Sequence, residues 1–258
     1  MFFSVIDGHR RVLGALIMRE MQTRFGRQGL GFAWLVGEPM LFCLGVVALW
    51  TMTKPAYEHG VSVAPFVMTG YMALLLIRHM INLLTAAIQA NTGLLYHRRV
   101  APLHLLAARF LLELAGATGA FLVVYVVLML IGLASPPADY LLLYGGWALI
   151  AWLSSGFALV MTGLVMRYEI FERVVGLISY ILIPLSGAFF MVAWLPPTAQ
   201  SVALLMPFVH GIEMIRAGVF GEFVETHYSV TYPLLVGAIL NILGLSMVSA
   251  SMDRIDVD

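Results

Sequence analysis

Residues 13–50, the stretch that decides the fold, read LGALIMREMQTRFGRQGLGFAWLVGEPMLFCLGVVALW. In its first half, apolar residues recur at helical spacing between Leu13 and Met21 while arginines supply charge, a pattern typical of a helix lying in a membrane interface. Glycines interrupt this pattern, and from Phe32 the chain stays apolar to about Met52, long enough to cross a bilayer at roughly 1.5 Å per residue. We therefore expect residues 1–30 to form a cytoplasmic amphipathic interface helix and an elbow.

The composition of the chain agrees with a protein that lies largely within the membrane. Of its 258 residues, 61% are hydrophobic and 11% are charged, whereas soluble domains average about 45–50% and about 25%. The net charge is zero, so bulk charge identifies no partner, and we expect no nucleic acid. The single cysteine, Cys43, excludes an internal disulfide and is interpreted as a buried hydrophobic residue.

Six apolar stretches predict an all-α membrane protein, with a permease domain over residues 31–252 and a cytoplasmic tail over 253–258. The expected spans are Phe32–Met52, Ala64–Ile88, Leu105–Leu133, Leu141–Met166, Val174–Trp194 and Pro233–Ser251. Most of the fourteen Lys and Arg residues fall in the N-terminal stretch, in the connections after spans two and four, and in the tail. Because positive charge accumulates on the cytoplasmic side, we expect both termini there.

The connection between spans two and three, residues 89–102, reads QANTGLLYHRRVAP. A short helix ending at Pro102, with aromatic and basic side chains facing outward, would suit docking to another protein. An ordinary basic loop obeying the positive-inside rule explains the same residues equally well.

Residues 195–232 are too long for a turn and too apolar for a solvated loop. Pro196 and Pro207 divide them, and the two short apolar helices that follow these prolines are expected to re-enter the membrane or to cover something within it. Glu213 and Arg216 lie three residues apart on one helical face, beside His210, and we expect them to form a structural pair.

Several kinds of chemistry are missing from the sequence. The single lysine, Lys54, lies in Thr-Lys-Pro, so the chain has no phosphate-binding P-loop, and any ATP that drives it must bind another chain. No cluster has metal-ligand spacing, and the serines at 154 and 155, followed by Gly156, lack the first of the two flanking glycines of an intramembrane protease. We expect neither a catalytic residue nor a cofactor on this chain.

Charged residues within spans are functional candidates, because each costs about 2.5–3.5 kcal/mol at a helix centre on the insertion scale. Arg109 and Glu113 lie four apart in span three and are expected to pair. Arg78 and His79 fall near the middle of span two, and Glu38 lies near the cytoplasmic end of span one. His79 is the best candidate for a proton carrier, although a satisfied buried histidine is the favoured interpretation.

Three motifs in order resemble the ABC transporter type-2 permeases that export polysaccharides, and in particular their capsule-export members. They are LIMREMQTRFGRQGLGFAWLVGEP at 16–39, QANTGLLY at 89–96 followed by Arg98 and Pro102, and MPFVHGIEMIR at 206–216. Two positions depart from the family pattern: Met206 stands where Asn is usual, and Arg78 is basic where we expect no charge.

The resemblance implies a homodimer in the bacterial inner membrane, powered by two separate ATPase subunits that bind ATP and Mg. It implies that spans one and five line the path, and that periplasmic and outer-membrane capsule-export proteins continue it. The ATPase would dock on Asn91, Gly93, Leu94, Tyr96, Arg98, Arg99 and Pro102. The extracytoplasmic gate would include Pro196, Pro207, His210, Glu213 and Arg216.

The cargo implied by the resemblance is a lipid-linked acidic polysaccharide. Its anionic lipid head would bind at the elbow, where guanidinium groups suit phosphate, through Arg19, Arg24 and Arg27, with Trp34 and Glu38 nearby. The same arginines could instead bind ordinary anionic membrane lipids. Two alternatives remain for the whole protein: export of O-antigen or teichoic acid by the same class of permease, and proton-coupled transport through His79.

Overall fold

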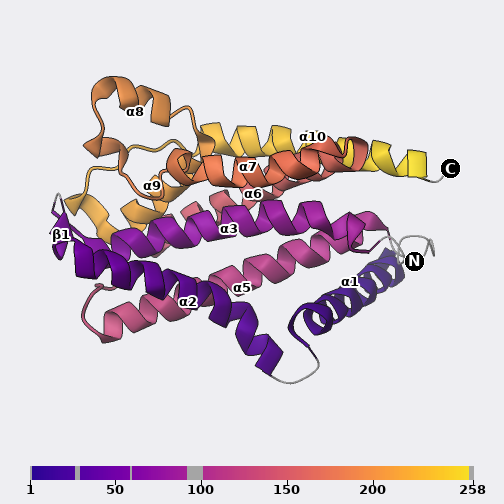
Figure 1. The fold of residues 1–258 in the computed structure, drawn as a ribbon, viewed down its shortest axis with the longest axis horizontal. Helices are drawn as coiled ribbons and strands as arrows, with labels where there is room; N and C mark the ends of the chain where they lie inside the picture. The colour runs from indigo at the N-terminus through magenta and orange to yellow at the C-terminus, as the bar shows by residue number, and fades with distance from the viewer. Residues whose placement is uncertain (1, 27–29, 59, 92–100, 256–258) are drawn as a thin grey trace.

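The computed structural model describes residues 2–26, 30–58, 60–91 and 101–255, and these residues are almost entirely helical (Figure 1). The long helices are α1 (Phe2–Phe25), α2 (Leu30–Thr53), α3 (Val63–Gln89), α5 (Pro102–Leu130), α6 (Tyr140–Arg167), α7 (Ile170–Leu185) and α10 (Thr231–Ile255). The short elements are β1 (Tyr57–Glu58), β2 (Val61–Ser62), η1 (Val192–Trp194), α8 (Pro197–Ala203), α9 (Pro207–Phe220) and η2 (Gly221–Phe223).

Five of the described helices are long and apolar enough to cross a membrane: α2, α3, α5, α6 and α10. A sixth crossing is obtained if α8 and α9, which meet at a bend of 105°, are taken as one broken span. The predicted all-α membrane fold is therefore confirmed.

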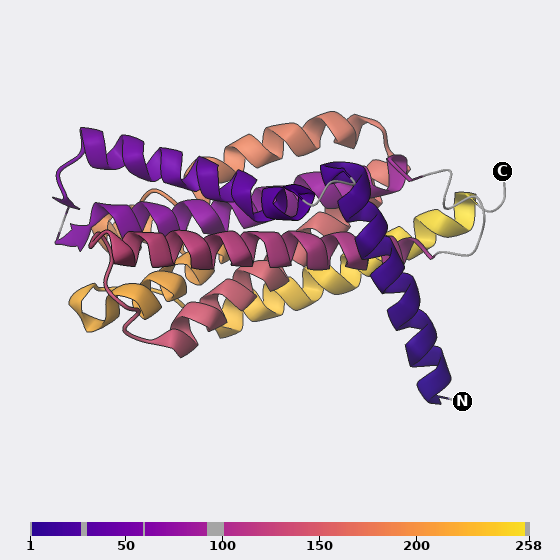
Figure 2. The same cartoon turned by 90° about the horizontal axis from the view of Figure 1, so that it is seen from below.

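The spanning helices run side by side along the long axis of the molecule, and α1 leaves the bundle at a steep angle (Figure 2). The N-terminal end of α1 and the C-terminal end of α10 lie at the same end of the bundle, together with the C-terminal end of α3 and the N-terminal end of α5. The short elements β1, α8 and α9 lie at the opposite end. This arrangement agrees with an interface helix on one membrane face and short covering helices on the other.

The core centres on α3, whose apolar side chains are buried from Val63 to Ile88 and which packs against α2, α5, α6, α7 and α9. α2 and α7 lie on one face of the bundle, with α3 between them (Figures 1 and 2). Glycines bring α6 and α10 together: a Cβ added at Gly163 would lie 2.6 Å from the Met247 Cβ, and one at Gly244 would lie 2.5 Å from the Leu159 Cβ. Small residues at such contacts allow membrane helices to approach closely.

The prediction of an unbroken fifth span over Val174–Trp194 is wrong. The corresponding helix, α7, has 16 residues and ends at Leu185, so it is about 24 Å long at 1.5 Å per residue. Pro184 lies in its last turn, and Gly187 follows with φ +84°, a conformation that favours glycine. Residues 186–191 then continue as irregular backbone.

Candidate functional sites in the bundle

Four charged residues form two ion pairs between α1 and α5. Arg109 Nε lies 2.7 Å from Glu20 Oε1, and Arg24 Nη1 forms an ion pair with Glu113 Oε1. Glu20 and Arg24 are four apart on α1, as Arg109 and Glu113 are on α5, so each helix presents one acid and one base to the other. We call these four residues the charge ladder.

The prediction that Arg109 pairs with Glu113 is wrong. Each residue instead pairs with α1, because α1 crosses the end of α5 and supplies a complementary acid and base at the same spacing. Sequence analysis missed Glu20, although its spacing from Arg24 repeats that of Arg109 and Glu113.

Residues of α3 also contact the charge ladder. His79 Nδ1 lies 3.5 Å from Glu113 Oε2, and Arg109 Nη1 donates a hydrogen bond of 2.7 Å to the Leu83 carbonyl oxygen. Glu20, Arg109 and Glu113 are all buried. The ladder therefore holds α1, α3 and α5 at a common level, and it satisfies charges that would be costly if unpaired.

The residues predicted to bind a lipid head are spread over this region. Arg24 belongs to the ladder, and Arg19 has a buried Nη1 atom with no hydrogen-bond partner among the described residues. Trp34 and Glu38 lie on the exposed face of α2, where Trp34 is 56% exposed. Arg27 lies outside the described residues. The lipid-head role stays a prediction.

Most of the predicted ATPase-docking residues also lie outside the described residues: Gly93, Leu94, Tyr96, Arg98 and Arg99. Of the remaining two, Asn91 is buried and donates from Nδ2 to the Ala87 carbonyl oxygen, and Pro102 is the first residue of α5. Asn91 thus satisfies a carbonyl group in the last turn of α3. Pro102 begins the next helix, at a position where a missing backbone N–H is tolerated.

Arg216 organises the opposite end of the bundle. Its side chain is fully buried and donates three hydrogen bonds, from Nη1 to the carbonyl oxygens of Gly187 and Phe190 and from Nη2 to that of Ala188. Its guanidinium also lies over the Phe66 ring, 4.2 Å from the centroid. Arg216 therefore supplies the donors that the irregular backbone after α7 needs in a membrane.

Glu213 and His210 hold the segments on either side of α9. The expected Glu213–Arg216 pair is present at 3.6 Å, and Glu213 also accepts hydrogen bonds from the backbone N–H of Val192 and His227. His210 Nδ1 accepts from the Ser229 N–H, so its Nε2 carries the proton and donates to the Leu204 carbonyl oxygen at 2.8 Å. The polar side chains of α9 thus fix the backbone around them, and the proposed gate role stays a prediction.

Pro196 and Pro207 set the boundaries of the short helices. Pro196 precedes α8 as its N-cap, and Pro207 is the first residue of α9. A proline at the start of a helix fits there because its fixed φ is already helical. The two prolines therefore place the helix starts where the sequence predicts them.

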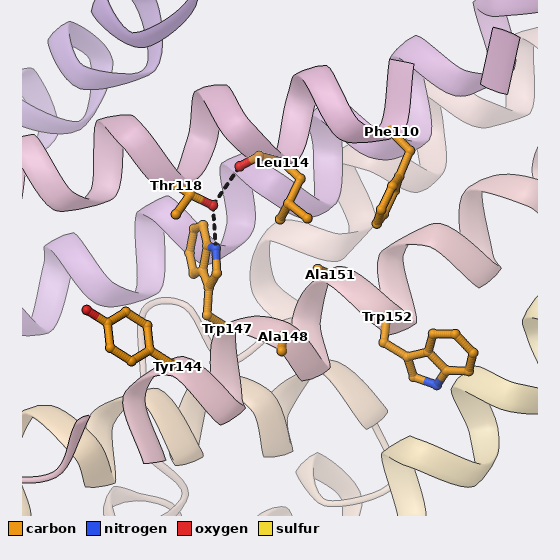
Figure 3. A pocket seen from close by; sticks show the side chains of 8 residues that line it. All are labelled: Phe110, Leu114, Thr118, Tyr144, Trp147, Ala148, Ala151 and Trp152. Atoms are coloured by element: carbon orange, nitrogen blue, oxygen red, sulfur yellow. Dashed lines mark hydrogen bonds between the residues drawn. The ribbon is translucent and has the colours of Figure 1, made fainter. Parts of the chain in front are cut away.

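A groove of about 320 Å³ opens on the outer surface between α5 and α6 (Figure 3). Its lining is apolar and aromatic, and Trp147 Nε1 donates to Thr118 Oγ1, which donates to the Leu114 carbonyl oxygen. With the indole N–H groups of Trp147 and Trp152 and the hydroxyl of Thr118 already paired, the groove offers mainly dispersion contacts. Within the described ranges, no three His, Cys, Asp or Glu side chains gather as a metal site.

Comparison with known proteins supports the family that the three sequence motifs indicate. A family described as "ABC-2 type transporter" matches residues 11–220. The capsule polysaccharide export inner-membrane protein CtrC of Neisseria meningitidis serogroup B is 40% identical over 96% of this chain and 94% of its own. The corresponding BexB of Haemophilus influenzae is 39% identical over 92% and 90%.

A more distant relative is the polysialic acid transport protein KpsM of Escherichia coli, which is 27% identical over 90% of each chain. The similarity to CtrC and BexB extends over nearly the whole length, so it includes the charge ladder, the α9 polar residues and the segment between α3 and α5. The resemblance expected from the three motifs is confirmed.

Proposed function

The chain belongs to the ABC-2 type transporter family, and from that premise we propose that it is the membrane permease of an exporter of capsular polysaccharide. The observation that carries this proposal is the near full-length similarity to inner-membrane proteins named for capsule polysaccharide export.

The proposed assembly is a homodimer with two ATP-binding subunits. The chain has no P-loop, so ATP and Mg would bind the partner subunits, whose nucleotide cycle would push on residues 89–102. The ends of α3 and α5 that flank this segment lie at the same end of the bundle as the N-terminal end of α1 and the C-terminal end of α10, which supports one cytoplasmic face (Figure 1). Force applied there would reach α1 through the charge ladder.

The proposed path runs along the face formed by α2 and α7, the first and fifth expected spans. Both helices carry large exposed apolar side chains, such as Phe42 at 59% and Leu177 at 60%. Covering this face with a second copy would leave a passage between the copies, capped by α8 and α9. From there, periplasmic and outer-membrane export proteins would continue the route of a lipid-linked acidic polysaccharide.

Deleting the gene in an encapsulated host tests the proposal. We expect the polymer to accumulate inside the cells and to vanish from the surface, and we expect the intact gene to restore it. Normal surface capsule in the deletion strain would contradict the proposal. Loss of lipopolysaccharide O-antigen or teichoic acid, with capsule retained, would identify the other glycans as cargo.

An energy-source experiment separates this function from proton-coupled transport through His79. Export by membrane vesicles that contain the permease and its ATPase should stop with vanadate and persist with a protonophore. The reverse result would favour a carrier in which His79, 3.5 Å from Glu113, takes up a proton.

A further inference from the structure

Arg78 lies deep within α3, and no acidic side chain in the described part of the chain pairs with it. It is about 22 Å from the start of α3 and about 16 Å from its end at 1.5 Å per residue, so it lies within the bilayer core. Among the described residues, no carboxylate lies within ion-pair distance of its guanidinium, and its buried Nε has no hydrogen-bond acceptor.

Arg109 and Arg216 are buried, whereas Arg78 is partly exposed. Among the described residues, Arg216 also has an Nε with no hydrogen-bond partner, but unlike Arg78, both Arg109 and Arg216 have an acidic partner. Arg109 is held by Glu20 and a backbone carbonyl, and Arg216 by Glu213 and three carbonyls. Arg78 contacts the aromatic ring of Tyr180 in α7, whose centroid lies 5.4 Å from the guanidinium carbon. A ring face attracts a cation more weakly than a carboxylate does, so this guanidinium keeps its capacity to bind an anion.

Polar groups continue along α3 on either side of Arg78. One turn away, Asn82 accepts a hydrogen bond of 2.9 Å from Ser179 of α7, and two turns in the other direction lies the half-buried Tyr71. Positions 71, 78 and 82 share one face of the helix. Arg78 and Asn82 contact α7 through Tyr180 and Ser179, and α7 and α2 lie on one face of the bundle with α3 between them (Figures 1 and 2). Tyr180 itself is 67% exposed.

A cation at this depth is incompatible with a lipid-covered surface unless water or an anion reaches it. If a hydrated passage runs over α3 and α7, water solvates the Arg78 guanidinium at this depth, and the charge no longer faces lipid. We propose that Arg78, together with Tyr180 and Tyr71, forms a binding site in the translocation path for the negatively charged groups of the glycan.

This inference rests on the proposed export function and adds to it the place where the polymer's charge is recognised. The planar guanidinium pairs with a sugar carboxylate or phosphate through two hydrogen bonds. The Arg78 guanidinium contacts the Tyr180 ring while no polymer is present. It returns to this contact when an anionic group of the polymer dissociates. Such exchange lets each repeat bind and depart, as a conducting pathway requires.

A cysteine-accessibility experiment tests the hydrated surface without depending on export. Cys43 is buried and is replaced by Ala to give a cysteine-free background, into which Arg78→Cys or Tyr180→Cys is introduced. Leu122→Cys, at a 43% exposed position on α5, is the control for a lipid-covered surface. In the complex with its ATPase, a charged, membrane-impermeant thiol reagent should modify positions 78 and 180 and spare position 122. Absence of labelling at 78 and 180 would overturn the inference even in a working exporter.

An export experiment tests the recognition of charge. Arg78→Gln should lower the surface polymer per membrane-inserted permease by roughly ten-fold, the loss expected for a charge-assisted hydrogen bond, and Arg78→Lys should retain more. Tyr180→Phe should behave as wild type, because it keeps the ring. The matched control is Arg167→Gln, since Arg167 also lies over a tyrosine ring, 5.6 Å from the centroid of Tyr168, but at the end of α6.

The outcomes separate the two proposals. If the wild-type gene fails to restore capsule to the deletion strain, the export function is wrong, whatever the labelling shows. If the wild type restores it and Arg78→Gln exports as well as Arg167→Gln at equal membrane levels, export stands and the role of Arg78 is overturned. Retained ATPase binding by Arg78→Gln excludes a folding defect as the reason for lost export.

Discussion

Buried charges decide how α1 attaches to the bundle. Glu20 and Arg109 are each almost fully buried, and each satisfies the other across two helices. Removing one member of such a pair leaves a charge without a partner, which costs about 3–5 kcal/mol, whereas exchanging both members keeps the attraction.

We therefore predict that Glu20→Gln and Arg109→Gln each lower the thermal stability of the detergent-purified protein. The double exchange Glu20→Arg with Arg109→Glu should recover most of the loss, measured as the midpoint of aggregation by fluorescence-detected size exclusion. A double exchange no more stable than the single variants would contradict a direct pair.

The same ladder bears on the lipid-head prediction. Arg24 is engaged with Glu113, so Arg24→Gln would change the packing of α1 as well as any lipid contact. Arg19 and Arg27 are the better positions for testing lipid binding, and replacing both by Gln should impair export without loss of assembly. Normal capsule in that variant would remove these two arginines from the cargo site.

A glycine on α3 allows the segment after α7 to come close. A Cβ added at Gly70 would lie 2.0 Å from the Ala188 carbonyl oxygen, which accepts a hydrogen bond from Arg216. We predict that Gly70→Ala lowers the yield of monodisperse protein in size exclusion. Gly45→Ala is the control, because no heavy atom lies within 4 Å of a Cβ there, and equal losses in both variants would contradict the packing argument.

At the scale of elements, α9 acts as the support for the irregular segments around it. Its polar side chains bind the backbone at residues 187–192, 204 and 227–229. A motion that opens this end of the bundle would have to move these segments with α9 or break several hydrogen bonds at once. We therefore expect the end cap to move as a unit.

Arg216→Lys tests this support. A lysine ammonium lacks the planar fork that reaches three carbonyl groups, so we predict a lower melting temperature and faster proteolysis between α7 and α9. Arg173→Lys, at an exposed position of α7, is the matched control and should behave as wild type. Equal protease resistance of the two variants would contradict the role of Arg216 in holding the segment.

At the scale of the whole molecule, the proposed function requires force from an ATPase partner. Tyr96 and Arg98 lie outside the described residues, in the connection between two helices that the charge ladder ties to α1. We predict that Tyr96→Ala combined with Arg98→Ala lowers the amount of ATPase that copurifies with the permease. Unchanged copurification, at equal membrane levels, would count against docking through residues 89–102.

The sequence by itself determined the class of the molecule: apolar runs of span length, positive charge gathered in alternate connections, and three motifs in a fixed order. These are local properties, so they can be recognised without knowing which helices touch. The short helices after Pro196 and Pro207 and the Glu213–Arg216 pair were predictable for the same reason.

Only the tertiary structure decided which charges pair and where the fifth helix ends. Four-residue spacing made Arg109 and Glu113 look like partners within α5, but α1 crosses them with an acid and a base of its own. Hydropathy extended the fifth span past Leu185, because apolarity alone does not reveal that Arg216 binds the carbonyl groups of the irregular backbone after the helix. The same holds for Arg78, which has no counter-ion among the described residues because of how the helices pack around it.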